Sequence, residues 1–450
     1  MNENAMSKGQ TIPSGQALPT TTQILAAQGA PRAMPLHCQR MILANGIVLL
    51  VAENPVADII AARIFIRAGS LRETPEQAGL SHLVAAVLTK GTEQLSAREI
   101  AERVESVGAS LGTDVAPDYF LLNLKTVSAD FADILRLAGE LLRSPTFPEQ
   151  EVELERRLML QAIRSQQEQP FALALEQLRQ GMYGTHPYAQ SGPGTIAAMT
   201  QLERNDLQQY HQTYFRPDHL VISLAGRITP AAAIALVQQV FGDWQVPATL
   251  PPDLNLPSIL PQPQQRVIVQ PTQQSIVMLG YLAPAVQAAD YAALKLLNTY
   301  LGNGLSSRLF VELREKRGLA YEVSAFYPTR LDTSHFVVYM GTAPENTAIA
   351  QSSLQAEINR LRDASLSVDE LKAAQNKILG QYALGKQTNA QIAKILGWYE
   401  TIGLGLEYDL QFQKDIAAVT VEMAYQAACQ YFIEPYVSLV GPAEAVQAQN

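Results

Sequence analysis

The densest group of polar side chains in the sequence lies in the segment REKRGLAY, residues 314–321. The guanidinium of Arg317 and the phenol of Tyr321 could together donate hydrogen bonds to a polarised carbonyl group or to its oxyanion. The alternative is an ordinary helix end, with cations in the last turn and Gly318 as the left-handed residue that follows it. The residues alone leave both interpretations open.

His82 lies in a stretch with helical spacing, and a helix can present two metal ligands on one face. The second ligand would stand three or four residues later, at Ala85 or Ala86, and neither residue has a ligating atom. His186 and His219 fall in loops, where a hydrogen bond to the backbone is the expected role. The remaining histidines, which also lack ligand spacing, are His37, His211 and His335. The residues themselves therefore indicate no metal site.

Nucleophilic and phosphate-binding sites are not indicated either. The sequence contains no GxSxG motif, and its two cysteines, Cys38 and Cys429, do not form a CxxC pair. The glycine-rich turn 302–304 is not followed by the GK[ST] of a phosphate loop. We interpret residues 306–308, Ser-Ser-Arg, as an ordinary helix cap.

The composition narrows the class of protein. The chain has 450 residues, with 33 basic and 42 acidic side chains and a formal net charge of −9. Nucleic acid is not expected as the main ligand, because no basic stripe is available to neutralise phosphates. A hydrophobic fraction of 47% excludes wholesale disorder. No run of 18 apolar residues occurs, so no membrane span is expected, and the low cysteine content favours a reducing compartment.

The elements that would position these residues form two similar series. Residues 1–35 are expected to be a disordered tail, without the features of a secretory signal, and the expected location is the bacterial cytoplasm. A hairpin is predicted around Asn45-Gly46, and further strands at IIAARIFIRAG, YFLLNLKTV and LVISLAG. Helices are predicted over residues 78–90, 97–107, 129–142 and 148–167.

A proline-rich stretch separates the two series. Residues 246–264 contain six prolines in 19 residues, which is typical of a semi-extended linker. After it come strands at SIVMLGYLAP, AYEVSAFY and HFVVYMG and helices over 290–301, 308–316, 347–363 and 368–380, and SLVG repeats the earlier SLAG. We therefore predict a duplication into two related α+β domains, residues 36–245 and 265–450, joined by the linker.

Four segments resemble the M16 zinc peptidases, the family of pitrilysin and the mitochondrial processing peptidases. They are residues 78–112, AGLSHLVAAVLTKGTEQLSAREIAERVESVGASLG; HPYAQSGPGT; YHQTYFRPDHLVISLAG; and LGNGLSSRLFVELREKRGLAYEVSAFY. The resemblance extends from about residue 38 to about residue 443. It implies two similar α/β-sandwich domains, each an antiparallel-rich sheet with packed helices, that form half of a clam-like chamber.

The resemblance also implies that the zinc site of this chain is degenerate. Active members carry H-x-x-E-H, in which both histidines bind zinc and the glutamate activates water. Here His82 remains, while Ala85 stands at the general-base position, Ala86 at the second ligand and Ala162 at the third. Catalytic zinc normally needs three protein ligands, so no cofactor is expected in this chain and zinc is expected in a partner. The substrate-facing strand, Leu111-Gly112-Thr113-Asp114, also departs from the family pattern.

RGLAY matches the Arg/Tyr element that, in two-chain members, the zinc-less subunit supplies to the active site of the zinc subunit. The resemblance therefore implies a non-catalytic subunit of a heterodimeric M16B peptidase, inactive alone, that donates Arg317 and Tyr321 in trans. The expected partners are a homologous chain with an intact H-x-x-E-H and an unfolded peptide, which would pair with a sheet edge of the zinc subunit.

Two other classes remain open. One is a proteolytically inactive scaffold subunit, like the core proteins of this kind in a respiratory complex. The other is a homodimeric module that binds unfolded peptide without cutting it. A stand-alone peptidase ranks last, because Ala85, Ala86 and Ala162 cannot be replaced by neighbouring side chains.

Overall fold

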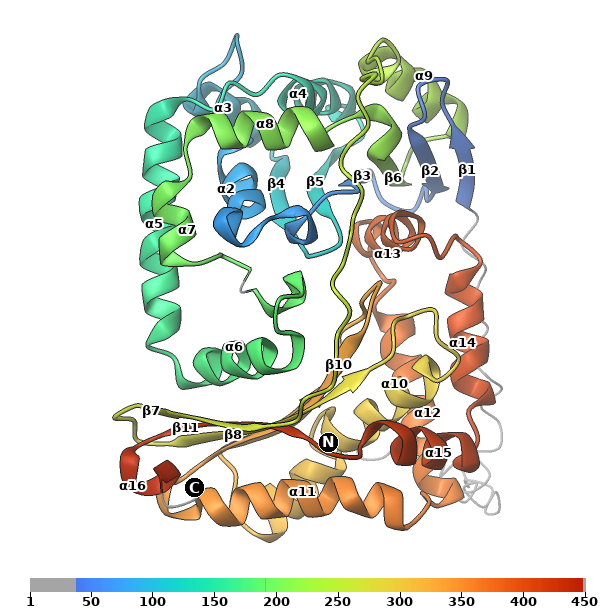
Figure 1. The fold of residues 1–450 in the computed structure, drawn as a ribbon. Helices are drawn as coiled ribbons and strands as arrows, with labels where there is room; N and C mark the ends of the chain where they lie inside the picture. Colours follow the sequence, from blue (N-terminus) through green and yellow to red (C-terminus); the bar gives the residue numbers. More distant parts are fainter. Residues whose placement is uncertain (1–37, 191, 448–450) are drawn as a thin grey trace, which may run out of the picture. The chain divides into compact units, whose positions relative to one another are not determined.

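The computed structural model describes residues 38–190 and 192–447. The predicted tail, residues 1–35, and His37 lie outside the described residues. The described chain contains two β-sheets and many helices, which confirms the predicted α+β class (Figure 1). No helix in this part of the chain is long and apolar enough to cross a membrane.

The first sheet contains six strands and forms the core of the N-terminal half. In spatial order they are β1 (Cys38–Ile42), β2 (Val48–Glu53), β6 (Leu220–Gly226), β3 (Ile59–Ile66), β5 (Phe120–Val127) and β4 (Ser110–Val115). Only β2 and β6 run parallel, and the other neighbours are antiparallel. The predicted hairpin is confirmed, because β1 pairs with β2 around a turn in which Gly46 has a φ of 86°.

The second sheet contains five strands from the C-terminal half. Their order is β7 (Gln265–Val269), β11 (Tyr436–Gly441), β8 (Ser275–Ala283), β10 (Ser334–Thr342) and β9 (Glu322–Phe326). Here β7 and β11 are parallel and the others antiparallel. Apart from β1, the order and directions reproduce those of the first sheet. This agreement supports the duplication that the repeated series of elements predicted.

Helices cover both sheets. Those of the N-terminal half are α2 (Leu80–Val87), α3 (Ala97–Ser106), α4 (Phe131–Arg143), α5 (Glu149–Gln167), α6 (Pro170–Tyr183), α7 (Ile196–Gln201), α8 (Arg204–Tyr214) and α9 (Pro230–Phe241). Those of the C-terminal half are α10 (Tyr291–Gly302), the π-helix η5 (Phe310–Lys316), α11 (Thr347–Asp363), α12 (Val368–Leu384), α13 (Asn389–Thr401), α14 (Tyr408–Ala418), α15 (Val421–Tyr431) and α16 (Ala443–Val446). Short 3₁₀ turns are η1 (Ser70–Arg72), η2 (Pro75–Gln77), η3 (Pro187–Ala189), η4 (Pro217–His219) and η6 (Pro344–Asn346).

Each half contributes one helix to the sheet of the other half. α13 packs on β3 and β6 of the first sheet, and α6 packs on β8 and β11 of the second (Figure 1). Asn389 fixes the start of α13, because its amide donates to the Ile59 carbonyl at 3.0 Å and accepts from Asn54 at 2.8 Å. This exchange buries both faces of each sheet, which explains why strands such as β6 are buried along their whole length.

Two features of the fold were not predicted from the sequence. Strand β7 was not predicted, because it is short and lies at a sheet edge directly after the prolines. Helices α13 to α15 were also missed. Residues 246–264 contain neither helix nor strand, in agreement with an extended connection. The domain boundaries themselves stay a prediction.

Candidate functional site

Helix α2, which carries His82, begins at a buried carboxylate. Glu73 accepts hydrogen bonds from the backbone N–H groups of Gly79 at 2.8 Å and Ser81 at 2.7 Å, and from the Ser81 hydroxyl. These bonds satisfy N–H groups that have no partner within the helix, and a negative charge at this end interacts favourably with the helix dipole. Burial nevertheless raises the pKa of Glu73 to about 7. The carboxylate therefore anchors the start of α2.

His82 lies one turn into α2, with its imidazole largely removed from water. Its Nδ1 atom is buried and has no hydrogen-bond partner among the described residues. Burial lowers the pKa of His82 to about 4, so the ring is neutral at physiological pH. A Cβ placed on Gly192 would lie 3.2 Å from His82 Nε2, so Gly192 lies directly against the ring.

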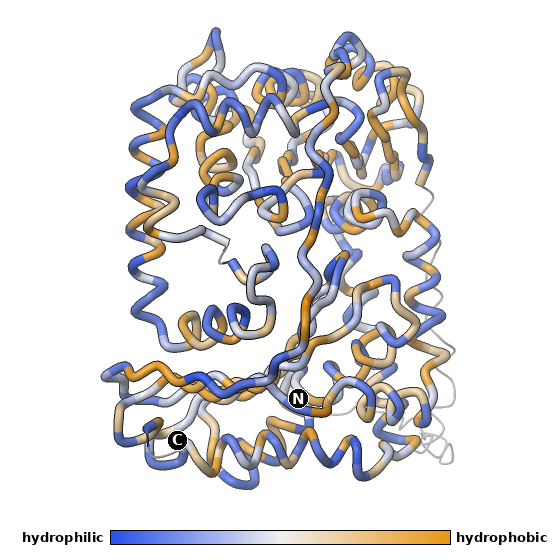
Figure 2. Tube along the Cα trace, in the orientation of Figure 1, coloured by the Kyte–Doolittle hydropathy of each residue, from blue (hydrophilic) through white to orange (hydrophobic). Residues whose placement is uncertain are grey.

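The three other positions that the resemblance assigns to the zinc site, Ala85, Ala86 and Ala162, have no ligating side-chain atom. Ala85 and Ala86 follow on α2, and the Ala85 carbonyl accepts a hydrogen bond of 2.7 Å from the Thr113 hydroxyl on β4. Ala162 lies exposed on α5, a helix that packs against α2 and whose hydrophobic positions gather in its middle (Figure 2). One imidazole and three methyl groups do not fit zinc, which requires about three protein ligands. Among the residues that the structure describes, no cluster of three His, Cys, Asp or Glu could hold a metal.

The Arg317–Tyr321 segment begins at the end of η5. Gly318 has a φ of 64°, its N–H bonds to the Arg314 carbonyl at 3.1 Å, and the N–H of Leu319 bonds to the Leu313 carbonyl at 2.9 Å. These two bonds cap the last carbonyl groups of the helix in the pattern expected for a glycine at this position. The prediction that Gly318 ends the helix is confirmed. It does not decide what the side chains on either side of Gly318 do.

Those two side chains differ in how they are held. Arg317 donates a hydrogen bond of 3.2 Å to the Ser353 hydroxyl and lies 3.7 Å from a Glu357 carboxylate oxygen on α11. Its side chain is still 45% exposed. Tyr321 is 65% exposed, its backbone N–H bonds to the Gly341 carbonyl at 2.9 Å, and its hydroxyl has no intramolecular partner among the described residues. The segment therefore presents a tethered guanidinium and a free phenol.

A network of ion pairs surrounds Arg317. The buried carboxylate of Glu357 also pairs with Arg308 at 2.8 Å, and Arg308 in turn pairs with Glu312 at 3.0 Å. Glu312 accepts a further bond of 2.8 Å from Lys316. Because Glu357 is shared between two arginines, Arg317 is oriented by this network without being fully neutralised by a carboxylate of its own. The orientation limits the number of positions that its guanidinium can reach.

The first half of the chain contains a matching turn. α3 leads into β4 as η5 leads into β9, and Gly108 at that turn has a φ of 62°, with the Ala109 N–H bonded to the Val104 carbonyl at 3.0 Å. One residue before and three residues after this glycine stand Val107 and Leu111, which pack against the hydrophobic core. The same two offsets from Gly318 give Arg317 and Tyr321.

The two loop histidines differ from each other. Nδ1 of His186 accepts a hydrogen bond of 3.1 Å from the Tyr188 backbone N–H, as predicted. For His219 the prediction is wrong at one ring atom, because Nδ1 is buried without a hydrogen-bond partner in the described part of the chain. His219 is the last residue of η4, and burial lowers its pKa to about 4, which keeps the ring neutral without a hydrogen-bond partner at Nδ1.

Sequence reasoning missed a polar cluster where α6 meets the second sheet. The Tyr183 hydroxyl lies 2.7 Å from His335 Nδ1, and the Tyr188 hydroxyl donates to Asp118 at 2.8 Å. Arg330 lies 3.9 Å from Asp118 and stacks on the Tyr188 ring at 5.0 Å. The HPY motif was a signal for Tyr188, but its partners Asp118 and Arg330 come from two other segments of the chain. These contacts join residues from both halves of the chain.

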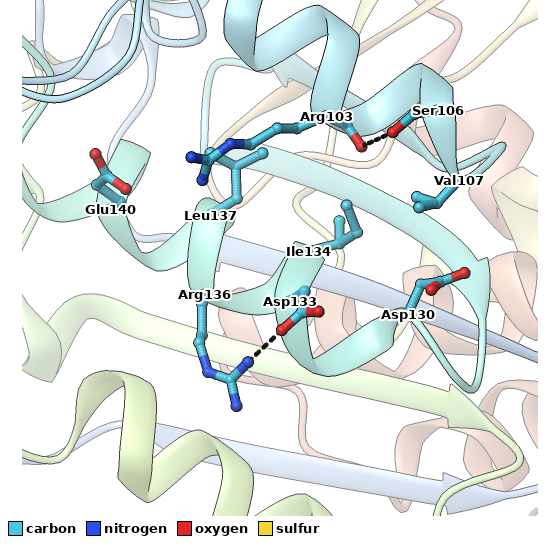
Figure 3. Close-up of a pocket in the computed structure, with 9 residues that line it drawn as sticks. All are labelled: Arg103, Ser106, Val107, Asp130, Asp133, Ile134, Arg136, Leu137 and Glu140. Atoms are coloured by element: carbon cyan, nitrogen blue, oxygen red, sulfur yellow. Dashed lines mark hydrogen bonds and ion pairs between the residues drawn. The ribbon is translucent and has the colours of Figure 1, made fainter.

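A groove of about 410 Å³ between α3 and α4 is lined by several charged side chains (Figure 3). Within it, Arg136 forms an ion pair with Asp133 of the same helix, and the Ser106 hydroxyl donates to the Arg103 carbonyl at 3.2 Å. No predicted site residue lines this groove. Its polar groups pair locally on an exposed face, so we assign it no function.

The two sheets of matching topology, with helices packed on each, define an α+β protein built from two similar halves. A sequence model described as "Insulinase (Peptidase family M16)" matches residues 48–195, and one described as "Peptidase M16 inactive domain" matches residues 201–378. Together the two matches span more than half of the chain. This protein belongs to peptidase family M16.

Relatives and solved structures agree with this assignment. The chain is 26% identical to the uncharacterized zinc protease YmxG of Bacillus subtilis over 90% of its length and 98% of that protein. It is also 26% identical to an uncharacterized zinc protease of Streptomyces coelicolor, covering 92% and 91%. A crystal structure of a peptidase M16 inactive domain from Pseudomonas fluorescens has a TM-score of 0.84 at 26% identity, covering 90% and 98%. A protease from Helicobacter pylori has the same fold, with a TM-score of 0.85 at 21% identity, covering 91% and 100%.

Proposed function

We propose that this chain is the non-catalytic subunit of a heterodimeric M16 peptidase and donates Arg317 and Tyr321 to the active site of its partner. The observation that carries this proposal is the pair of matching turns. In the first turn these two positions are occupied by the apolar residues Val107 and Leu111, which pack against the hydrophobic core. At Arg317 and Tyr321 the second turn carries polar residues whose side chains stay largely exposed, so their burial does not hold the turn in place.

The partner would be a homologous chain with an intact H-x-x-E-H motif. His82, Ala85, Ala86 and Ala162 do not form a zinc site, whereas the relatives of this chain are named zinc proteases. A division of labour between two related chains accounts for both facts. In it, each chain forms half of a chamber that holds an unfolded peptide, and the metal belongs to the other chain. Cys38 and Cys429 are both unpaired, which supports a reducing compartment such as the bacterial cytoplasm.

The two side chains suit complementary tasks. The hydroxyl of Tyr321 has no intramolecular partner, so it can donate to a substrate carbonyl oxygen without breaking an existing bond. Arg317 is held by Ser353 and Glu357 but still exposes nearly half of its side chain, so its charge can face substrate in a fixed orientation. Pre-oriented donors of this kind stabilise developing negative charge at little reorganisation cost, and losing one lowers turnover on the order of 10²–10³-fold.

The test is peptide cleavage by this protein, by its zinc-bearing homologue, and by the two mixed. We expect cleavage only in the mixture, with turnover reduced on the order of 10²–10³-fold by Arg317→Ala or Tyr321→Phe. Matched controls are Arg98→Ala, an exposed arginine on α3, and Tyr425→Phe, which removes a hydroxyl from α15. Both controls should leave turnover unchanged. Co-purification of the two chains, measured for each variant, separates loss of donation from loss of assembly.

Two outcomes would replace this proposal. If the homologue cuts equally well alone, or if the variants match their controls, the chain is a scaffold subunit. If the chain forms a stable homodimer that binds peptide and gains no activity from any homologue, it is a peptide-binding module.

A further inference from the structure

A cavity of about 360 Å³ lies among α10, α12, α13 and α14, apart from both the His82 region and the Arg317–Tyr321 turn. Its wall is largely aromatic, with rings from Tyr291, Tyr382, Trp398, Tyr399, Tyr408 and Phe412. Ligand pockets in proteins are typically of this size, with a mainly apolar wall and a few placed polar groups. The polar residues that line it include Lys295 and Asn298.

The first polar group is Lys295 on α10. Its ammonium donates one hydrogen bond, 2.7 Å long, to the Tyr327 carbonyl, and lies over the rings of Tyr291 at 5.2 Å and Tyr327 at 5.0 Å. Among the described residues no carboxylate pairs with it, and burial lowers the pKa of Lys295 to about 8. An ammonium group has three donors, so Lys295 keeps unused donors and an uncompensated charge at the cavity wall.

A second largely buried lysine, Lys386, differs from Lys295 in having a carboxylate partner. Lys386 also lies in a largely buried setting, and there Asp409 pairs with it at 2.9 Å. Asp409 also accepts a hydrogen bond of 2.6 Å from Tyr382, which in turn lies 2.7 Å from the Tyr399 hydroxyl. The fold therefore neutralises one buried lysine and fixes the aromatic wall with the same carboxylate. It provides no such partner for Lys295.

The second polar group is Asn298, which lies one turn after Lys295 on the same face of α10. Its Oδ1 atom is buried and has no hydrogen-bond partner in the part of the chain that the structure describes, and the residue lines the cavity. A buried acceptor without a partner is costly unless a ligand or water satisfies it. The cavity is thus lined by a residue with a cationic donor and, one helical turn further along α10, by a residue with an unpaired neutral acceptor, and six aromatic rings complete much of the wall.

We propose that this cavity binds a small aromatic carboxylate that also carries an N–H group. In this assignment the carboxylate pairs with Lys295, the N–H donates to Asn298 Oδ1, and the ring packs against the aromatic wall. An N-acylated aromatic amino acid and the C-terminal aromatic residue of a peptide share this chemistry. A free amino acid fits less well, because its own ammonium group would stand close to that of Lys295.

The test is calorimetric titration of the full chain with three probes that differ in one group each. N-acetylphenylalanine has all three features, N-acetylphenylalaninamide lacks the charge, and 3-phenylpropionate lacks the N–H. We expect N-acetylphenylalanine to bind at least about tenfold more tightly than either of the other two, a difference of about 1.4 kcal/mol. The tripeptide Ala-Ala-Phe, with a free C-terminus, distinguishes a peptide end from a small free acid. Fluorescence of Trp398, which lines the cavity, provides a second signal.

Two substitutions test whether the probes bind at Lys295 and Asn298. Lys295→Met should remove the preference for the acid over the amide, and Asn298→Ala should remove the preference for N-acetylphenylalanine over 3-phenylpropionate. Lys372→Met, on the exposed side of α12, is the matched control and should bind like the unsubstituted chain. Equal binding of acid and amide by the unsubstituted chain, or no saturable heat with any probe, would overturn the proposal. That comparison needs no variant, so it decides the question even if Lys295→Met fails to fold.

Discussion

The turn after α3 and the turn after η5 occupy corresponding places in two sheets of the same topology. Both end a helix with a glycine in the left-handed conformation, Gly108 at 62° and Gly318 at 64°. One residue before and three residues after the glycine, the first turn has Val107 and Leu111, which pack against the core, and the second has Arg317 and Tyr321, which are 45% and 65% exposed. The turn at Gly108 therefore serves as a reference within the same chain for the turn at Gly318. The comparison separates the glycine, which both turns share, from the flanking side chains, which differ between them.

Converting the second turn into the first tests this comparison with the largest expected effect. The double variant Arg317→Val, Tyr321→Leu copies the apolar residues that flank Gly108. We expect peptide cleavage by the mixture with the zinc-bearing homologue to fall on the order of 10²–10³-fold or more, because both donors are lost. The urea midpoint of unfolding should change little, since both side chains are exposed. A large loss of stability would mean that the two residues serve the fold and that the turns are not comparable.

The exchanged helices extend the comparison from the turns to the two sheets. A Cβ added to Gly397 on α13 would lie 2.5 Å from a Phe65 ring atom and 2.9 Å from Ser223 Cβ. A Cβ added to Gly280 on β8, beneath α6, would meet Met182 Sδ at 2.8 Å, and a methionine side chain can move aside. Overpacking typically costs about 1–3 kcal/mol.

We therefore expect Gly397→Ala to destabilise the protein near the upper end of that range, and Gly280→Ala near the lower end. Urea unfolding monitored by circular dichroism measures both. The reverse order of the two effects would mean that Met182 moves aside less easily than the Phe65 ring and Ser223.

Replacing Gly108 or Gly318 by alanine tests whether the two glycines contribute equally to the free energy of unfolding. A Cβ added at either glycine would find no atom within 4 Å, so steric clash with neighbours is absent and only the left-handed backbone is affected. That conformation costs an ordinary residue roughly 1–2 kcal/mol. Equal losses of that size are expected from urea unfolding of Gly108→Ala and Gly318→Ala. Markedly unequal losses would show that one glycine has a role which its matching turn lacks.

The sequence could predict those features of the fold and of the candidate site that depend on residues close together in the chain. The hairpin at Gly46 and the helix end at Gly318 follow from neighbouring residues, and both were predicted. The contacts of Arg317 could not be, because Ser353 and Glu357 lie on a helix much later in the chain. For the same reason nothing in the pattern around Asn389 indicates that α13 covers the first sheet, since its partners, Asn54 and Ile59, belong to the other half.

Substitution of His82 has the smallest expected effect, and it tests the α2 region separately from the turn at Gly318. Its folded-state pKa of about 4 lies below the usual value of 6.5, so between these values the unfolded chain binds the proton more tightly. Stability should therefore decline as pH falls from 6.5 toward 4, with His82 accounting for about 1 kcal/mol of that loss at pH 5.5. His82→Gln should reduce the decline, measured by urea unfolding at pH 7 and pH 5.5.

In the cleavage mixture at pH 7 the same variant should change nothing, because a neutral, buried imidazole with no fellow ligands contributes no metal chemistry. His211, whose pKa burial also lowers to about 4, is the natural control on α8. His211→Gln should reduce the acid sensitivity similarly. A loss of cleavage with His82→Gln but not with His211→Gln would mean that the first half of the chain, and not only the turn at Gly318, still takes part in the reaction.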